Sequence, residues 1–254
     1  MKIVSWNVNS IKARGEHVKR YLLETAPDVL MVQELKGLEF PAAEFEAMGY
    51  HTAAVCQKAY NGVAVFSKTP LTVIAQALSG DEADEQARYM EFETGGLRLI
   101  NIYLPNGNPV ESEKYPYKLR WMERLKSRLQ ELREEMTDFA IGGDFNVIPE
   151  DRDCWDPAIW ADDALFKIET RRQFRKFLNL GLTEAYRAHN GNVQEYTFWD
   201  YQAGRWQKNQ GIRIDHFLLS PGYADRLISC HIDKSPRGWD KPSDHTPVMV
   251  QIGA

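Results

Sequence analysis

The stretch Ala140-Ile141-Gly142-Gly143-Asp144-Phe145-Asn146 decides the fold, because it joins a buried strand to a polar end. Two glycines after an apolar run indicate a strand that a neighbouring backbone approaches closely. Every second side chain of an extended segment points to the same face, so Asp144 and Asn146 can project together. The stretch therefore predicts a sheet edge that carries functional polar groups, with an Asx turn that caps the strand as the structural alternative.

Three distant segments repeat this arrangement of a buried strand followed by polar residues. They are Trp6-Asn7-Val8-Asn9, Gln33-Glu34-Leu35-Lys36 and Ser243-Asp244-His245-Thr246-Pro247. The carboxylate of Glu34 after the apolar run 27–33 is not needed for packing, although a solvated loop glutamate would look the same when taken alone. Together the four segments predict one polar site at one edge of the fold.

Strand-like runs outnumber helical ones along the chain. Strands are expected at 3–8, 29–33, 62–66, 97–104, 139–142, 195–200, 214–219 and 247–252, and helices near 16–24, 117–136 and 170–180. The residues 80–88 and 105–114 are typical of exposed loops. Because strands and helices do not alternate regularly, the pattern favours two sheets packed face to face with helices outside. No linker or composition break appears, so a single domain over 1–254 is expected.

The composition limits the class of protein. The apolar content of 43% is enough for a large core, and no apolar run is long enough to form a membrane-spanning helix. Because no targeting segment is visible at the start of the sequence, a cytoplasmic location is expected. The three cysteines, Cys56, Cys154 and Cys230, are widely spaced and odd in number, which argues against a disulfide scaffold or a zinc ribbon.

The net charge of −5 weighs mildly against nucleic acid as a partner, since phosphate binding depends on lysine and arginine. A carboxylate-rich metal site removes the conflict, because clustered acids lower the net charge while local basic patches still face phosphates. Most basic side chains are expected to be solvated, with groups at 12–14, 118–124, 171–175 and 234–241.

The polar segments supply the parts of divalent-metal phosphodiester hydrolysis. Glu34 is the expected direct metal ligand, because Mg²⁺ takes one or two carboxylates and keeps several waters. The carbonyl of Asn7 is expected to contact the metal directly or through water, and Asp244 has three open roles: direct ligand, water-mediated ligand or second site. Asp144 is the expected group for proton transfer with the attacking water.

A second set of residues is expected to handle the phosphate. Asp215 lies between apolar neighbours and needs a partner, for which His245 is the natural choice, either as a phosphate-facing imidazole or as a purely structural pair. Tyr103 and Asn106 end another strand and are candidates for contact with a phosphate oxygen or the leaving group. The aromatic run 196–201 with Trp206 suits either stacking on an unpaired nucleotide or core packing.

Taken together, these residues closely resemble the exonuclease III family of abasic-site endonucleases, within the endonuclease/exonuclease/phosphatase superfamily. The resemblance spans nearly the whole chain. It is carried by the segments 6–14, 27–36 and 209–220 together with Gly143-Asp144-Phe145-Asn146 and Lys241-Pro242-Ser243-Asp244-His245. One segment departs from it: Glu184-Ala185-Tyr186-Arg187 stands where the family usually has Asp-Ser/Thr-Phe-Arg, which puts details of substrate contact in doubt.

The resemblance implies a four-layer α/β sandwich of the DNase I-like kind, with two packed mixed β-sheets flanked by helices. It also implies Mg²⁺- or Mn²⁺-dependent cleavage of double-stranded DNA, 5′ to an abasic site to leave a 3′-hydroxyl, and trimming of 3′ ends. A monomer without membrane contact is expected.

By motif match, the resemblance assigns the site residues. Asn7 and Glu34 would hold the metal, Tyr103 would act near the phosphate, Asp144 and Asn146 would position or activate water, and Asp215 would orient His245. Beside this motif match, Asp244 is expected at the metal, and Asn106, Asn209 and Trp206 are expected to contact the substrate. Phe198, Ile212 and Ile214 match positions that wall the abasic pocket. Ile212 stands where some relatives have tryptophan, so we hypothesise that it alters the balance of endonuclease and exonuclease work. Two other classes of function stay open, a phosphatase for small phosphoesters or phosphoinositides on the same fold and a non-catalytic DNA-binding protein.

Overall fold

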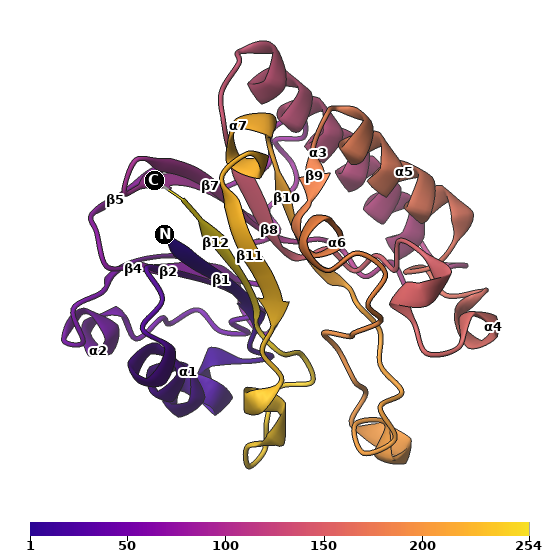
Figure 1. The fold of residues 1–254 in the computed structure, drawn as a ribbon, viewed down its shortest axis with the longest axis horizontal. Helices are drawn as coiled ribbons and strands as arrows, with labels where there is room; N and C mark the ends of the chain where they lie inside the picture. Colours follow the sequence, from indigo (N-terminus) through magenta and orange to yellow (C-terminus); the bar gives the residue numbers. More distant parts are fainter. Residues whose placement is uncertain (254) are drawn as a thin grey trace.

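Two six-stranded β-sheets pack face to face in the computed structural model, which describes residues 1–253 (Figure 1). The first sheet contains β1 (Lys2–Asn7), β2 (Val29–Gln33), β3 (His51–Val55), β4 (Val63–Ser67), β11 (Leu227–Ile232) and β12 (Val248–Ile252), in the order β11-β12-β1-β2-β4-β3. The second contains β5 (Leu71–Ala75), β6 (Tyr89–Thr94), β7 (Leu97–Tyr103), β8 (Ala140–Asp144), β9 (Thr183–Glu184) and β10 (Asp215–Leu219), in the order β5-β6-β7-β8-β10-β9.

Helices cover the outer face of each sheet (Figure 1). The first sheet is covered by α1 (Ile11–Thr25) and α2 (Ala42–Glu46), and the second by α3 (Lys114–Glu134) and α5 (Ile168–Asn179). Short elements lie in the connections: α4 (Pro157–Trp160), α6 (Ala185–Asn190), α7 (Pro221–Ala224) and the 3₁₀ turns η1 (Asp151–Asp153), η2 (Gln202–Gly204) and η3 (Ser235–Gly238). The four-layer α/β sandwich expected from the sequence is confirmed.

Three apolar layers hold the sandwich together. Met31 and Phe217 belong to the layer between the sheets, Trp121 to the layer under α3 and α5, and Trp6 to the layer under α1 and α2. All four side chains are buried. Burial of a large apolar side chain contributes roughly 1.5–3 kcal/mol, so these layers supply most of the stabilisation.

A polar link crosses the apolar layer between the two sheets. Gln33 of β2 donates its amide Nε2 to Asn101 Oδ1 of β7 at 2.7 Å. Asn101 in turn donates its Nδ2 to the carbonyls of Val32 at 3.1 Å and Ala64 at 2.9 Å, both in the first sheet. Both amide side chains are fully buried, so each bond forms without competition from water.

Each sheet contains one parallel pair at its centre, β1 with β2 and β7 with β8, among otherwise antiparallel neighbours. The close approach predicted for the two glycines of β8 is confirmed. A Cβ atom at Gly142 would lie 2.4 Å from Cε1 of Phe217, and one at Gly143 would lie 2.0 Å from the carbonyl oxygen of Ile102. These glycines let β8 lie at the centre of the second sheet, where it carries Asp144.

The inner strands of the two sheets were predicted except for β6, and their four edge strands were missed. Seven predicted strands correspond to β1, β2, β4, β7, β8, β10 and β12, but the expected strand at 195–200 is wrong. That segment is a loop joined to its neighbours by isolated bridges from Phe198 to Ile212 and His245. The missed strands β3, β5, β6, β9 and β11 include edge strands such as β5, in which exposed and half-buried residues alternate. The three predicted helices correspond to α1, α3 and α5.

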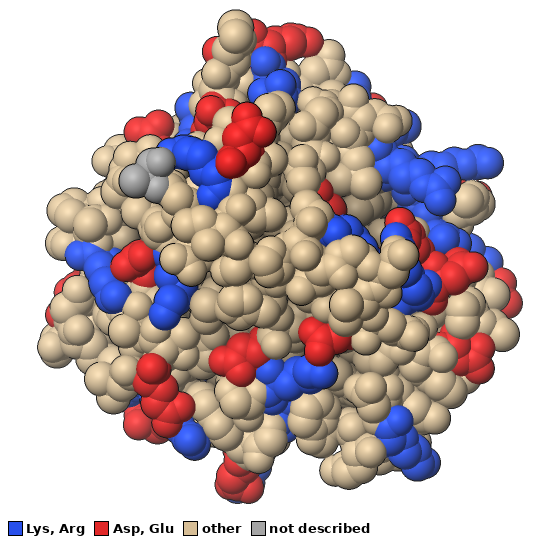
Figure 2. Space-filling model, viewed as in Figure 1, with Lys and Arg blue, Asp and Glu red and all other residues tan. Residues whose placement is uncertain are grey.

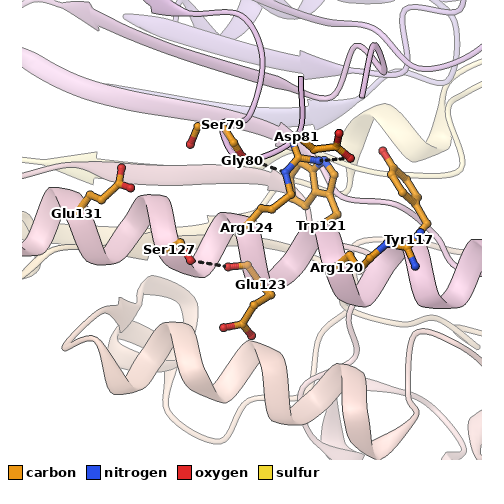
Figure 3. Close-up of a pocket in the computed structure, with 10 residues that line it drawn as sticks. All are labelled: Ser79, Gly80, Asp81, Tyr117, Arg120, Trp121, Glu123, Arg124, Ser127 and Glu131. Atoms are coloured by element: carbon orange, nitrogen blue, oxygen red, sulfur yellow. Dashed lines mark hydrogen bonds and ion pairs between the residues drawn. The ribbon is translucent and has the colours of Figure 1, made fainter. Parts of the chain in front are cut away.

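The predicted loop after residue 80 is held down on α3 (Figure 3). Arg124 donates to the carbonyl of Ser79 at 2.9 Å and forms an ion pair with Asp84 at 2.7 Å. The hollow between this loop and the helix has a volume of about 570 Å³, with the buried Trp121 at its base. Arg124 is thus a structural cation.

Acidic and basic side chains are interspersed over the face drawn in Figure 2, with basic groups gathered at the edge where α5 lies in Figure 1. Within residues 1–253, no helix has the length and hydropathy needed to cross a membrane. All three cysteines are free thiols, as expected; Cys154 and Cys230 are buried and Cys56 is partly buried.

Candidate active site

The carboxyl ends of the two parallel strand pairs meet at one end of the sandwich and bring the predicted polar residues together. Asn7 ends β1 and is in register with Gln33, the residue before Glu34, while Tyr103 ends β7 in register with Asp144 at the end of β8. Because parallel strands end at the same sheet edge, residues far apart in sequence meet across the two sheets.

Asn7 connects two carboxylates from different sheets. Its Nδ2 donates to Glu34 Oε1 at 3.1 Å and to Asp144 Oδ2 at 3.0 Å. Its carbonyl Oδ1 accepts from the backbone N–H of Asn9 at 3.0 Å, and its expected contact with a metal, directly or through water, stays a prediction. Tyr103 donates its hydroxyl to Glu34 Oε1 at 2.6 Å. Asn7 therefore fixes the distance between Glu34 and Asp144.

Asp215 and His245 form the predicted pair. Asp215 lies opposite Asp144 in the antiparallel pairing of β10 with β8, and its Oδ2 contacts His245 Nδ1 at 2.9 Å. Nε2 of His245 faces Asp144 Oδ2 at 3.7 Å. Burial alone would lower the pKa of His245, but Asp215 and Asp144 outweigh it and raise the pKa to about 10. The imidazole is therefore a buried cation at neutral pH.

Burial and neighbouring charge act on Asp144 as well. Burial, with Asp215 and Glu34 nearby, raises the pKa of Asp144 to about 7, although His245 opposes the shift. The backbone N–H of Asn146 donates to Asp144 Oδ1 at 2.9 Å. A carboxyl group poised near neutrality suits proton transfer.

Lys118 holds together the two loops that carry Asn106 and Asn146. Its Nζ donates to the carbonyl of Asn106 at 2.9 Å and to the carbonyl of Asn146 at 2.6 Å, and the two amide side chains also bond to each other at 3.1 Å. The expectation that this lysine is solvated is wrong, because its side chain is fully buried and its burial lowers the pKa to about 7.

The donor set fits a divalent cation. Asp144, Asp215 and His245 each present one potential ligand atom within 4.8 Å of the others, but the cationic His245 is paired with Asp215, which leaves the carboxylate oxygens as the donors. Asp215 Oδ1 is buried without a hydrogen-bond partner in the described chain. Glu34 Oε2 forms an ion pair with the Lys36 ammonium at 2.7 Å. The sequence assigned no role to Lys36 and left the role of Asp244 open. In the structure, Asp244 Oδ1 accepts from Asn9 Nδ2 at 3.0 Å.

A cavity of about 250 Å³ opens beside these groups. The predicted wall residues Phe198, Ile212 and Ile214 line it together with Asp144, Asp244 and His245. The ring of Phe198 meets that of His245 edge to face, with centroids 5.0 Å apart. Trp160, Asp163 and Leu165 line the same cavity and were missed, since nothing in the sequence of this segment signals that it folds back onto the site.

A wider hollow of about 750 Å³ continues from Glu34, Tyr103 and Asn106. Cationic side chains along it are Lys36, Arg88 and Lys114. Basic groups beside a carboxylate cluster agree with the expectation that local patches offset the negative net charge.

Two predicted substrate residues lie outside these cavities. Trp206 packs edge to face on Trp199, with centroids 4.7 Å apart, and lies under the Arg237 guanidinium. Asn209 is exposed, and its Oδ1 accepts from Trp199 Nε1 at 3.3 Å. Neither lines the cavity beside Asp144, so their contact with substrate stays a prediction.

The departing segment 184–187 serves a buried ion network. Glu184 pairs with Arg213 at 2.8 Å, and Arg213 also contacts Asp153 at 2.8 Å. Arg187 joins the same carboxylate of Asp153, and both carboxylates and Arg213 are buried. This network lies next to β10, which carries Asp215, and none of its members lines the cavity beside Asp144.

Comparison with known proteins agrees with this geometry. Residues 4–245 match the model of the Endonuclease/Exonuclease/phosphatase family. An exodeoxyribonuclease III from Haemophilus influenzae is 31% identical over 99% of this chain and all of that protein. An AP endonuclease from Archaeoglobus fulgidus and a 3′-5′ exonuclease from Neisseria meningitidis are each 36% identical over the full length of both chains, with TM-scores of 0.95 and 0.97.

The chain belongs to the Endonuclease/Exonuclease/phosphatase family. Within it, the chain is a DNA repair nuclease of the exodeoxyribonuclease III and AP endonuclease type, with DNA as its substrate and a metal ion as its cofactor.

Proposed function

We propose that this nuclease cleaves duplex DNA 5′ to an abasic site and leaves a 3′-hydroxyl, and that it also removes nucleotides and blocking groups from 3′ ends. The observation that carries the proposal is the apolar wall of Phe198, Ile212 and Ile214 beside Asp144 and His245. A sugar without its base is free to leave the duplex and enter such a cavity at small cost. One neighbour, a 3′ phosphatase from Neisseria, is known with a product DNA hairpin, and this supports the 3′-end reaction.

The residues of the chain divide the reaction between them. Asp144 takes the proton of the attacking water. The Asn146 backbone N–H and the Asn7 side-chain amide donate to the Asp144 carboxylate and hold it in place. His245, a cation oriented by Asp215, stabilises charge on a phosphoryl oxygen as the phosphate is attacked.

Five residues are proposed to support the substrate and the cofactor. Tyr103 and Asn106 contact the phosphate or the leaving group, and Glu34 is the principal ligand of the cation, with Asn7 and Asp244 supporting it directly or through water. We propose Mg²⁺, with Mn²⁺ as a substitute. When bound, such an ion acts as a Lewis acid that neutralises developing charge on the phosphate.

The enzyme is proposed to act as a monomer in the cytoplasm. Light scattering on the purified chain tests the first statement, and a mass near twice 29.3 kDa would contradict it. Fractionation of cells that express the chain tests the second.

The deciding experiment is cleavage of an end-labelled duplex that carries one tetrahydrofuran abasic analogue, with an undamaged duplex alongside, in Mg²⁺ and in chelator. We expect Mg²⁺-dependent incision 5′ to the analogue and slower shortening of the undamaged 3′ end. Release of phosphate from a small phosphoester without cleavage of either duplex would instead favour the phosphatase. Metal-independent binding without turnover would favour a non-catalytic DNA-binding protein.

A further inference from the structure

A second cavity lies behind the active-site cavity and has no part in the roles assigned so far. Its volume is about 240 Å³, and five of its lining residues also line the cavity beside Asp144: Trp160, Asp163, Phe198, Asp200 and Ile212. The side chain of Ile212 is buried between the two, and its backbone bridges to Phe198 on one side and Cys154 on the other. The cavities are therefore two neighbouring chambers that share one wall.

Flat conjugated groups line the second chamber. Trp155 and Trp160 contribute two indole rings, and the guanidinium of Arg205 lies 4.9 Å from the ring of Trp155. Gln210 accepts from Arg205 Nη1 at 2.9 Å, which holds the guanidinium in place. Aromatic rings and arginine planes are the surfaces on which unpaired bases stack.

The polar groups of the chamber favour a base over a phosphate. The carboxylates of Asp163 and Asp200 lie in its wall and repel an anion. The chamber is smaller than the roughly 300–1,000 Å³ of sites for drug-sized ligands, as suits one planar ring system.

We propose that this second chamber binds the unpaired nucleobase of the nucleotide whose 5′ phosphodiester lies at Asp144 and His245. The inference rests on the proposed function and concerns those of its substrates that keep a base, such as a mismatched 3′-terminal nucleotide. The sugar occupies the first chamber, as an abasic sugar does, and the base reaches the second chamber over the wall that the two share. Phosphate contacts stay with the residues of the first chamber.

The test compares two reactions of the full-length enzyme in Mg²⁺: removal of a mismatched 3′-terminal nucleotide, and incision at a tetrahydrofuran analogue that has no base. Stacking contributes roughly 1–3 kcal/mol per base, so Arg205→Ala and Trp155→Leu should each lower the ratio of the first kcat/KM to the second about tenfold. The loss should appear in KM. Lys208→Ala, an exposed change in the same loop, should leave the ratio at the wild-type value.

A second readout keeps the test independent of cleavage. With Asp144→Asn in Mg²⁺, we expect quenching of 2-aminopurine at an unpaired 3′ terminus when the enzyme binds, and loss of this quenching when Trp155→Leu or Trp160→Phe is added. An unchanged cleavage ratio together with unchanged quenching would overturn the base chamber and leave the proposed function standing. Absence of abasic incision by the wild type would overturn the proposed function, while the quenching would still decide whether the chamber binds a base.

Discussion

Replacing Glu184 by glutamine should destabilise the protein in a pH-dependent way. Glu184 is a buried carboxylate with Arg213 at 2.8 Å, and it also accepts from the backbone N–H of Arg187 at 2.8 Å. Burial alone would raise its pKa, but Arg213 and His216 outweigh it and lower the pKa from 4.5 to about 2. The difference between these two pKa values corresponds to about 3 kcal/mol of folding stability, which Glu184→Gln should remove at pH 7.

The sign of the pH dependence follows from the lowered pKa. The contribution of Glu184 is complete above pH 4.5, the pKa of the unfolded chain, and declines as the pH falls toward about 2. Between pH 7 and pH 3.5 the difference in the free energy of unfolding between wild type and variant should therefore narrow by about 1.4 kcal/mol.

Urea unfolding followed by circular dichroism at the two pH values measures both free energies. Glu123→Gln is the matched control, since Glu123 and its partner Lys176 are about half exposed and such a pair contributes roughly 0.2–1 kcal/mol. If Glu184→Gln lowers the free energy of unfolding by the same amount at pH 7 and pH 3.5, the argument from the charge of Glu184 is refuted.

Three further changes test the site and the core. Asp144→Asn should reduce turnover on an abasic duplex at least ~10²-fold with little change in DNA affinity, and near-normal turnover would remove Asp144 from proton transfer. Gly142→Ala should cost about 1–3 kcal/mol in urea unfolding because its Cβ would lie 2.4 Å from Phe217, whereas Gly15→Ala, with open space around it, should cost nothing. Ile212→Trp should lower the ratio of 3′-exonuclease to abasic-site cleavage roughly tenfold, and equal ratios in both enzymes would contradict the role given to this side chain.

The sequence predicted most of the strands that are buried on both sides, although the buried β6 was missed. Continuous apolar runs identified β2 and β8, and the polar residues at their ends, Glu34 and Asp144, proved to be neighbours. The alternating pattern of β5 was missed because a half-exposed strand at a sheet edge resembles a loop in composition.

What escaped prediction depends on contacts made across long sequence separations. Lys118 has the sequence context of a solvated helix residue, and only the folded positions of the Asn106 and Asn146 carbonyls explain its burial. Trp160 reaches the cavity because its connection folds back over the site, whereas Trp206, equally aromatic, packs against Trp199. Residue type alone does not distinguish these two tryptophans.

The buried amide link between Gln33 and Asn101 bears on how the active site stays aligned. Apolar layers resist separation of the two sheets but resist slip along their faces weakly, because the hydrophobic effect has no preferred direction. Glu34 belongs to one sheet and Asp144 to the other, so a slip of about 1 Å would misplace them even with every strand intact, and such an error costs about 10²-fold in rate. A hydrogen bond of fixed length and direction between the sheets opposes that motion one residue before Glu34. The alignment of the catalytic residues in this nuclease thus depends on the buried hydrogen bond that holds its two sheets in a fixed position relative to each other.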